Sequence, residues 1–235
     1  AAGEPVNAET KRVYVVNLRG KLGRDVSATP MKGIMKDIRK EQPDIVVFRL
    51  DLHFAGGRGA DIQKDMALPE LDTARQLATM FTENLLQDES WIKKPQIVMW
   101  VRRAMGGAAF FPFVAKDIFF TSDGLHGGLQ GLETGWGGMD ERVRQKMMGI
   151  FRTRAEGLAQ LGNHDERLVK AMMGYDYTLS VTVVGGKPEC HEDYTGEILL
   201  KDNPIEDKAR LDSIEEVARG RGNDLLTLNA KTAMD

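Results

Sequence analysis

The feature that most constrains the fold of this chain is a series of short apolar runs that alternate with helical patterns. The runs are rich in β-branched and aromatic residues and predict buried strands at residues 13–18, 45–50, 97–101 and 117–120. Between the first two runs, Ile34, Met35 and Ile38 share one face of an amphipathic helix, and residues 71–86 follow the same spacing. Strands alternating with helices imply right-handed parallel crossovers and therefore an α/β core.

The charge and cysteine content exclude several classes of protein. The 32 Lys and Arg residues against 35 Asp and Glu residues give a net charge of -3, without the basic excess of a nucleic-acid-binding protein. A single cysteine, Cys190, excludes an internal disulfide and a zinc site built on several thiolates. The four histidines lack metal-ligand spacing, so we expect no metal and no cofactor. The longest apolar run, residues 108–115, is far shorter than the ~20 residues of a membrane span.

The chain divides into three parts by composition. Residues 1–10 are small and polar and predict a flexible arm, residues 11–175 carry the α/β pattern, and residues 176–235 read as a small α+β lobe that continues the same domain. In this lobe we expect residues 179–184 and 197–200 to form a hairpin around Gly185-Gly186, followed by a charged helix over 205–219 and a strand over 225–228. The chain begins with AAGEP, as a removed export signal would leave it, although a trimmed chain would look the same; we therefore expect an exported protein.

Two glycine-rich turns are the candidates for chemistry. FAGGRG (residues 54–59) and AMGGAA (residues 104–109) each follow a predicted strand and open a helix. Turns of this kind direct backbone N–H groups toward one cleft, where they can bind an anion or a developing oxyanion. Neither turn matches the phosphate-binding GxxxxGK[ST] pattern. The alternative interpretation is that the glycines only let helices pack close to the sheet.

The order of these motifs resembles the ClpP/crotonase superfamily. VYVVNLRGKL, DIVVFRLDLHFAGGR and KKPQIVMWVRRAMGGAAFFPFVAKDIFF are similar to its peptidase branch. MDERVRQKMMGIFRTRAEGLAQLGN and the final DLLTLNAKTAMD are similar to the NfeD-type membrane-bound ClpP-class serine proteases, which are partners of stomatin-like proteins. The resemblance covers roughly residues 11–175 and the last dozen. It implies a spiral of parallel strands and helices that ends in a small C-terminal lobe.

The resemblance also implies roles for three residues at the glycine-rich turns. Gly57 would supply one N–H group of the oxyanion hole, and Met105 would supply the second. The nucleophilic serine of the family lies immediately before that second residue, and this position is Ala104. A methyl group has no proton to give up and no lone pair to attack with, so the chain lacks the nucleophile.

Two bases are implied for such a nucleophile. In the NfeD branch the base is a lysine some forty residues further on, and Lys146 lies 42 residues after Ala104, with Arg144 as its neighbouring candidate. In ClpP itself the base is a histidine, and His126 lies 22 residues after Ala104. Lys146 could serve only if desolvation lowered its pKa toward neutrality, whereas a lysine among so many charges is usually a solvated surface group.

The function expected from this resemblance is that of a serine peptidase of the Ser–Lys type, acting on apolar peptide segments, present here in an inactive form. Ala104 is either a substitution that traps an inactive form or the mark of a natural pseudoenzyme. The flanking Arg102-Arg103 pair, where the family has small residues, favours natural divergence. The expected partners are a peptide or protein substrate, a stomatin-like membrane protein and further copies of the chain, with a membrane-associated extracytoplasmic location.

Two other functions stay open. FAGGRGADIQKDM is similar to the oxyanion turn of crotonases, in which Gly57 or Ala60 with Gly107 would polarise an acyl-CoA thioester. The hydratase's two catalytic glutamates are missing, however, and Glu133 is the only carboxylate in a glycine-rich loop that we expect over residues 124–138. A long polar helix is expected after this loop, from about residue 139 to Leu161. The third function is a non-catalytic assembly protein, since folds of this superfamily form rings through the helix after that loop.

Overall fold

The main body of the protein is a parallel sheet, seen in a computed structural model that describes residues 10–53, 67–128, 140–174, 177–202 and 226–233. The sheet has the order β1-β2-β3-β4-β8, and its first four strands are parallel, while the short β8 is antiparallel to β4. The α/β class predicted from the sequence is confirmed. The strands are β1 (Val13–Lys21), β2 (Ile45–His53), β3 (Gln96–Met105), β4 (Asp117–Gly127) and β8 (Thr227–Asn229).

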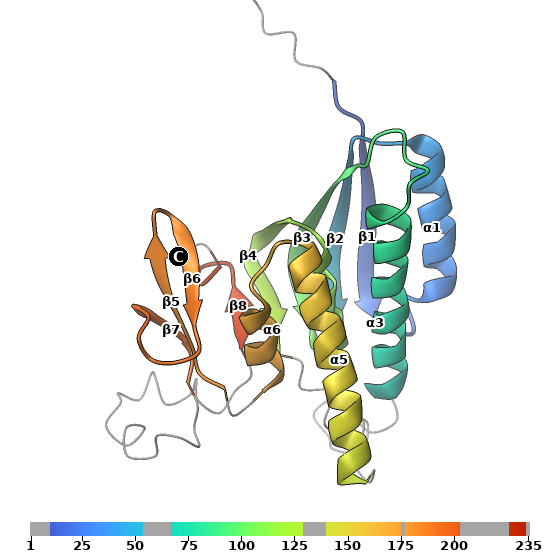
Figure 1. Cartoon of the computed structure of the whole chain (residues 1–235). Helices are drawn as coiled ribbons and strands as arrows, with labels where there is room; N and C mark the ends of the chain where they lie inside the picture. Colours follow the sequence, from blue (N-terminus) through green and yellow to red (C-terminus); the bar gives the residue numbers. More distant parts are fainter. Residues whose placement is uncertain (1–9, 54–66, 129–139, 175–176, 203–225, 234–235) are drawn as a thin grey trace, which may run out of the picture.

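The helices that connect these strands lie on one face of the sheet. α1 (Ala28–Glu41) links β1 to β2, and α3 (Ala67–Phe81), extended by a π-helical turn over Thr82–Leu86, links β2 to β3. Because the strand order follows the chain order and such crossovers are right-handed, both helices fall on the same side, and they pack beside each other. Figure 1 shows α3 and α5 in front of the sheet.

Alternation along the strands fills the core beneath these helices. Val46, Phe48, Leu50 and Leu52 of β2 are all buried, at 0–1% exposure, because every second side chain points to the helical face. The Phe48 ring packs on Phe81 of α3 at 4.8 Å between centroids, and Phe81 packs in turn on Phe111 at 5.8 Å. This run of aromatic rings joins the sheet, α3 and the turn after β3.

β3 leads into two short 3-10 helices rather than the α-helix expected after the second glycine-rich turn. They are η2 (Gly106–Phe110) and η3 (Pro112–Val114). Pro112 has no N–H group to continue an α-helical hydrogen-bond ladder, which limits this apolar stretch to single turns. The strand itself runs on to Met105, so the first two residues of the predicted turn belong to β3.

The long polar helix predicted after the glycine-rich loop is present as α5 (Glu141–Leu161), and α6 (Glu166–Met173) follows it. The Asp140 carboxylate caps α5 by accepting a hydrogen bond from the Arg142 N–H group at 2.9 Å. Gly162 ends α5 where a Cβ would lie 2.1 Å from the Phe113 carbonyl oxygen, so only glycine allows this approach. None of the helices in the described ranges is long and apolar enough to cross a membrane.

The C-terminal lobe is a second, antiparallel sheet of three strands in the order β6-β5-β7. Its hairpin turns at Gly185-Gly186, as predicted, but the partner strand is β6 (Lys187–His191). β7 (Ile198–Lys201), which we expected in that hairpin, pairs with the other edge of β5 (Leu179–Val184). Both glycines have positive φ, which suits a two-residue turn and makes the next residues the pairing partner. The expected helix over 205–219 and residues 1–9 of the expected arm lie outside the described residues.

The carboxyl end of the main sheet is closed by backbone contacts between distant segments. Gly128 donates its N–H group to the Leu226 carbonyl oxygen at 2.9 Å, and Leu226 donates its own to Ala171 of α6 at 3.0 Å. The residue before them, Gly127, has a φ of +129°, and a Cβ there would lie 2.4 Å from the Leu226 carbonyl oxygen. The segment that brings in β8 therefore requires glycine at position 127.

We predict that Gly127→Ala lowers the free energy of unfolding by roughly 2–4 kcal/mol, because the methyl group meets backbone at a disfavoured φ. Gly33→Ala is the matched control: a Cβ at Gly33 in α1 has no neighbour within 4 Å, so alanine should stabilise the helix by up to ~1 kcal/mol. Urea unfolding followed by circular dichroism measures both. An unchanged midpoint for Gly127→Ala would contradict the close approach.

Candidate functional site

The candidate site lies where β3 ends, at the carboxyl edge of the parallel strands. β3 stops at Met105, Gly106 adopts a left-handed φ of 61°, and η2 begins there, so the backbone turns sharply from strand to helix. The Gly106 N–H group donates to the Gly128 carbonyl oxygen at 3.2 Å, which ties this turn to the end of β4. Ala104, the predicted nucleophile position, lies just before the turn and is 0% exposed. Ligands of open α/β sheets usually bind at this edge.

One extra residue in β3 sets the direction of Ala104. Leu50 of β2 pairs with Val101, but the next residue of β2, Asp51, pairs with Arg103, so Arg102 is a β-bulge. Val101 points into the core, and without the bulge Arg103 would follow it there. With the bulge, Ala104 points into the core beside Leu52, while Arg102 and Arg103 both reach the opposite, helix-free face.

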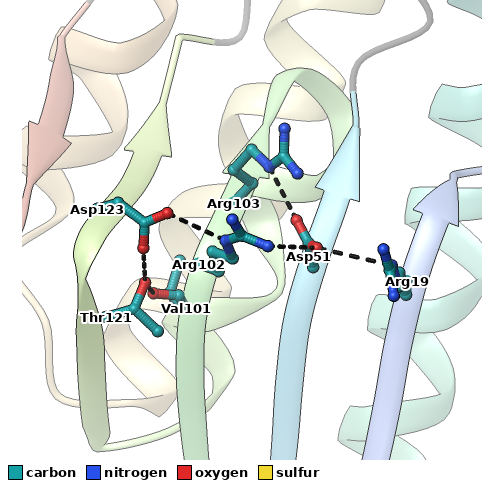
Figure 2. Close-up of polar contacts among 7 residues, drawn as sticks. All are labelled: Arg19, Asp51, Val101, Arg102, Arg103, Thr121 and Asp123. Carbon is teal, nitrogen blue, oxygen red and sulfur yellow. Dashed lines mark hydrogen bonds and ion pairs between the residues drawn. The ribbon is translucent and has the colours of Figure 1, made fainter.

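On that face the two arginines meet an aspartate (Figure 2). The Arg103 Nε atom lies 2.8 Å from Asp51 Oδ1, Arg102 Nη1 lies 3.4 Å from Asp51 Oδ2, and Arg19 Nε of β1 lies 3.8 Å from the same oxygen. The Asp51 side chain is 16% exposed. The bulge therefore lets a single carboxylate hold side chains from three parallel strands together. The sequence analysis missed this cluster, although the break in alternation at Arg102-Arg103 was its signal.

Arg102 extends the cluster to β4. Its Nε atom lies 3.1 Å from Asp123 Oδ2, and the Thr121 hydroxyl donates to Asp123 Oδ1 at 2.9 Å. The hydrogen bond from Thr121, followed by that from Arg102, lowers the pKa of Asp123. The bond to Asp123 raises the pKa of Arg102. Since Arg102 and Asp123 are solvent-exposed, water screens their ion pair, and the cluster orients side chains more than it stabilises the fold.

His126, the alternative base, is brought directly beside Ala104. The two residues are in-register partners on neighbouring parallel strands, so their side chains share the buried face at a strand spacing of about 4.8 Å. His126 is 1% exposed, and its ring packs on Phe113 at 4.9 Å between centroids. Its Nε2 atom donates to the Ala109 carbonyl oxygen at 2.9 Å, because a carbonyl oxygen can only accept. Burial lowers the pKa of His126 to about 4, so the imidazole is neutral at pH 7.

Lys146, the base implied by the NfeD-type resemblance, has a different environment. It lies on the amino-terminal half of α5 and is exposed. Of the apolar residues near it on α5, Val143 is 49% exposed and Ile150 is 40% exposed, while Met147 is partly buried against the core. The desolvation that a lysine base needs is not present around Lys146 in this structure. Its neighbour Arg144 pairs with Glu141 at 2.5 Å.

Two of the other predicted site residues, Met105 and Gly107, lie within the described residues. Met105 is half-buried at the end of β3. Gly57, the second oxyanion donor, lies outside the described residues, as do Ala60 and Glu133 of the acyl-CoA alternative. Gly107, the remaining residue of that alternative, is buried in η2. Within the described ranges, no three His, Cys, Asp or Glu side chains gather as a metal site.

A groove between α3 and α5 is a second feature that the sequence analysis missed. It has a volume of about 380 Å³ and none of the predicted catalytic residues lines it. Small residues on facing helices, Ala74 and Ala78 of α3 and Gly157 of α5, leave this space open, and Phe151 and Leu158 contribute apolar walls. Ala104 does not line the groove, so the groove is separate from the candidate site at the end of β3.

Comparison with known proteins gives a likeness in fold. No protein-family model and no curated protein matches the chain. Among solved structures, it is similar to the 1510-N membrane-bound stomatin-specific protease in a serine-to-alanine mutant form, at 12% identity and a TM-score of 0.48, covering 69% of both chains. It is also similar to a lysine-to-alanine mutant of 1510-N in complex with a substrate peptide, at 11% identity and a TM-score of 0.47, covering 70% of this chain and 66% of that one. No residue role follows from a likeness at this level.

The buried imidazole predicts a pH dependence of stability. A proton binds His126 more readily in the unfolded chain, where its pKa is 6.5, than in the folded chain, where it is about 4. The free energy of unfolding is therefore highest above pH 6.5 and falls as the pH drops toward 4. At pH 4.5 the decrease is about 2–3 kcal/mol. Urea unfolding at about pH 7.5 and about pH 4.5 measures this loss. His126→Gln keeps a hydrogen-bond donor for the Ala109 carbonyl oxygen but cannot titrate, so this variant should lack the decrease attributed to His126. An equal decrease in the variant would show that other groups cause the pH dependence.

Proposed function

We propose that this chain is a serine-peptidase-like protein of the ClpP class that keeps the strand-to-helix turn of the site but lacks its nucleophile. The observation that supports the proposal is the backbone at the end of β3. There β3 ends at Met105, the left-handed Gly106 starts a helical turn, and Ala104 is the residue immediately before Met105. A peptidase of this kind needs a hydroxyl group at that position to form an acyl-enzyme. The chain as it stands therefore carries out no serine-type hydrolysis.

His126 and Lys146 compete for the role of base in this proposal. His126 is in register with Ala104, and with its Nε2 atom bound to Ala109, its Nδ1 atom is the nitrogen left to accept a proton. A pKa of about 4 makes it a weak base, which suits orientation better than proton abstraction. Lys146 is exposed, so a bound substrate or partner would have to desolvate it before it could act as a base. The proposal keeps Lys146 as the base and His126 as the alternative.

The substrate, partner and location follow from the sequence resemblance and are part of the proposal. An active relative would cleave extended apolar peptide segments and associate with a stomatin-like membrane protein. The location would be extracytoplasmic and close to the membrane. The oxyanion hole would consist of the N–H groups of Gly57 and Met105.

A non-catalytic binding or assembly protein is the second candidate function. Two observations favour it: the side chain at position 104 is 0% exposed, and the predicted base Lys146 faces solvent. A non-catalytic binding protein uses the surfaces of the fold, so it needs no reactive and accessible side chain at position 104. The two candidates differ in one property, which is whether a hydroxyl group restored at position 104 becomes reactive.

We expect Ala104→Ser to become labelled by a serine-directed fluorophosphonate and to hydrolyse apolar peptides, while the unchanged chain does neither, because only a hydroxyl group can attack. Ala108→Ser is the matched control, since it places the same group at a buried alanine of η2, 2% exposed, a few residues further on. Adding Lys146→Ala or His126→Gln to Ala104→Ser then identifies the base. Loss of the base should lower the labelling rate by roughly 10²–10⁴-fold.

The opposite result is equally clear. If Ala104→Ser keeps its circular dichroism spectrum and unfolding midpoint but is neither labelled nor active, the peptidase proposal fails and the non-catalytic candidate replaces it. Labelling of Ala108→Ser to the same extent would show that the reagent reports general reactivity rather than a site.

A further inference from the structure

The strands at the two sides of the main sheet differ in regularity. At one side, β4 is irregular opposite Arg102 and pairs with β8 over its last three residues. At the other side, β1 pairs with β2 over all nine of its residues without a register shift. No other described strand pairs with β1, which Figure 1 shows at the far side of the sheet from β4. β1 is therefore a long and regular free edge.

The free edge of β1 presents a row of backbone groups without partners. The Arg12 carbonyl oxygen accepts hydrogen bonds from the N–H groups of Asp44 and Ile45, at 2.9 and 3.1 Å, so it faces β2. Successive residues of a strand direct their N–H and C=O groups to opposite sides. The odd-numbered residues of β1 therefore direct theirs away from β2: Val13, Val15, Asn17 and Arg19. Within the described ranges, nothing bonds to these outward backbone groups.

The chain itself closes this edge at its carboxyl end. The Lys21 N–H group donates to the Asp25 carboxylate at 2.8 Å, and the Lys21 carbonyl oxygen accepts from the N–H groups of Asp25 and Val26 at 2.8 and 3.1 Å. The outward groups of Lys21 are thus bonded, whereas those before it are not. The row over residues 13–19, which we call the free row, is about 20 Å long at ~3.3 Å per residue. It has room for one further strand of six or seven residues.

The free row lacks the features that usually protect the edge of a sheet. Natural edge strands are commonly short or interrupted by a proline, a charged residue or a bulge. Residues 13–18 read VYVVNL, without proline or charge, and pair with β2 in unbroken register. Val13 and Val15 are 53% and 49% exposed. A regular edge with apolar side chains beside it is a template for the addition of an extended peptide as a strand.

The charges at the two ends of the free row are cationic. Lys11 precedes the row, and Lys21 and Arg24 follow it. None of these three side chains forms an ion pair or a hydrogen bond with any described residue. Unpaired cations at both ends of an apolar edge favour a segment with acidic residues at both of its ends.

The acidic residues around this edge do not cancel its positive charge. Asp25 accepts the Lys21 N–H group, and Asp44 accepts the Arg12 N–H group at 2.9 Å. Residues 10–41, which hold β1 and α1, contain nine lysines and arginines against three acidic residues, although the whole chain has a net charge of -3. The part of the molecule around the free row is therefore positive in a protein that is negative overall, and its field attracts anionic partners.

The same cations oppose pairing of β1 with the β1 strand of another copy. In an antiparallel pair, Lys11 of each copy would lie near Lys21 of the other. In a parallel pair, each cation would lie beside its own equivalent. Like charges opposite each other on neighbouring strands are destabilising in both arrangements. The charge pattern thus selects against a second copy and for an acidic partner.

We propose that β1 is a docking edge for an extended segment of a partner protein, apolar in its middle and acidic at both ends, which joins the main sheet as a further strand. Backbone hydrogen bonds to the free row hold the segment, and its carboxylates meet Lys11 at one end and Lys21 with Arg24 at the other. β2 lies between β1 and β3, so this edge is separate from the candidate site at Ala104. The proposal does not depend on the peptidase function.

The first experiment measures the binding of two fluorescein-labelled peptides by fluorescence anisotropy. The acidic peptide DEVTVTVED is the probe, and KRVTVTVRK, with the same strand-forming middle and reversed charges, is its control. We expect one acidic peptide to bind per chain, at least about tenfold more tightly than the basic peptide, because only its ends complement the cations. The affinity should fall as the ionic strength rises, since salt screens exposed charges.

Variants of β1 separate strand addition from simple charge attraction. Val15→Pro removes one outward N–H group and leaves the pairing with β2 in place, so it should weaken binding of the acidic peptide at least about tenfold. Val15→Thr keeps the N–H group and the branched side chain and should bind as the unchanged chain does. Lys21→Glu should weaken binding roughly threefold or more. Lys187→Glu, the same change at an exposed lysine of β6, is its control and should have no effect.

Amide hydrogen exchange followed by NMR locates the bound peptide. Binding should slow exchange at Val15 and Asn17, whose N–H groups face the free edge, and leave Tyr14 and Val16 unchanged, because these already face β2. Slower exchange only in other parts of the chain would contradict docking at β1.

Several results would overturn the proposal. They are no binding of the acidic peptide up to about 1 mM, equal binding of the basic peptide, or equal binding by a Val15→Pro variant whose circular dichroism shows it folded. A second copy found on β1 by sedimentation, with the peptide excluded, would overturn it as well. Because these measurements report binding and not hydrolysis, their outcome is independent of whether Ala104→Ser becomes reactive.

Discussion

A single extra residue in β3, Arg102, determines which side chains of the strand's end lie on each face of the sheet. Side chains alternate along a strand, so inserting Arg102 into the register reverses the direction of everything after it. As a result, a small residue, Ala104, enters the core beside His126, and two guanidinium groups stay on the opposite face around Asp51. The bulge thus separates the buried pair of Ala104 and His126 on one side of the sheet from a charged cluster on the other, within three consecutive residues of β3.

The His126 imidazole beside Ala104 is neutral because of where it lies. His126 is enclosed by Phe113 and the backbone of η2, where a charged imidazole would lose its hydration without gaining a carboxylate. The turn around it is fixed by backbone hydrogen bonds between Gly106, Gly128 and Leu226 rather than by side chains. These backbone hydrogen bonds do not depend on the side chain at position 104.

The parts of the fold that the sequence predicted are those with a strong periodic signal. Runs such as IVVFRL and the helical spacing of Ile34, Met35 and Ile38 fixed the parallel strands and α1, because alternation and amphipathicity are local properties. The bulge at Arg102 and the cluster on Asp51 were missed, because they depend on which residue of β2 faces which residue of β3. The sequence left the burial of Lys146 open, and in the structure Lys146 is exposed, as are the apolar residues Val143 and Ile150 near it on α5. Pairing of His126 with Ala104 needed the strand register as well, so spacing along the chain could only suggest it.

The bulged segment of β4 also bears on how the protein avoids joining its neighbours edge to edge. Among the described strands, β8 pairs with β4 only at Leu125–Gly127, so the stretch from Asp117 to Phe120 has a strand on one side alone. Four residues, from Thr121 to Gly124, then lie opposite Arg102 alone, and this irregularity interrupts the row of N–H and C=O groups. A foreign strand at this side of β4 would find only the four regular residues from Asp117 to Phe120 before the irregularity. The irregular strand thus limits strand addition along β4, whereas β1, at the opposite edge, pairs regularly with β2 alone among the described strands.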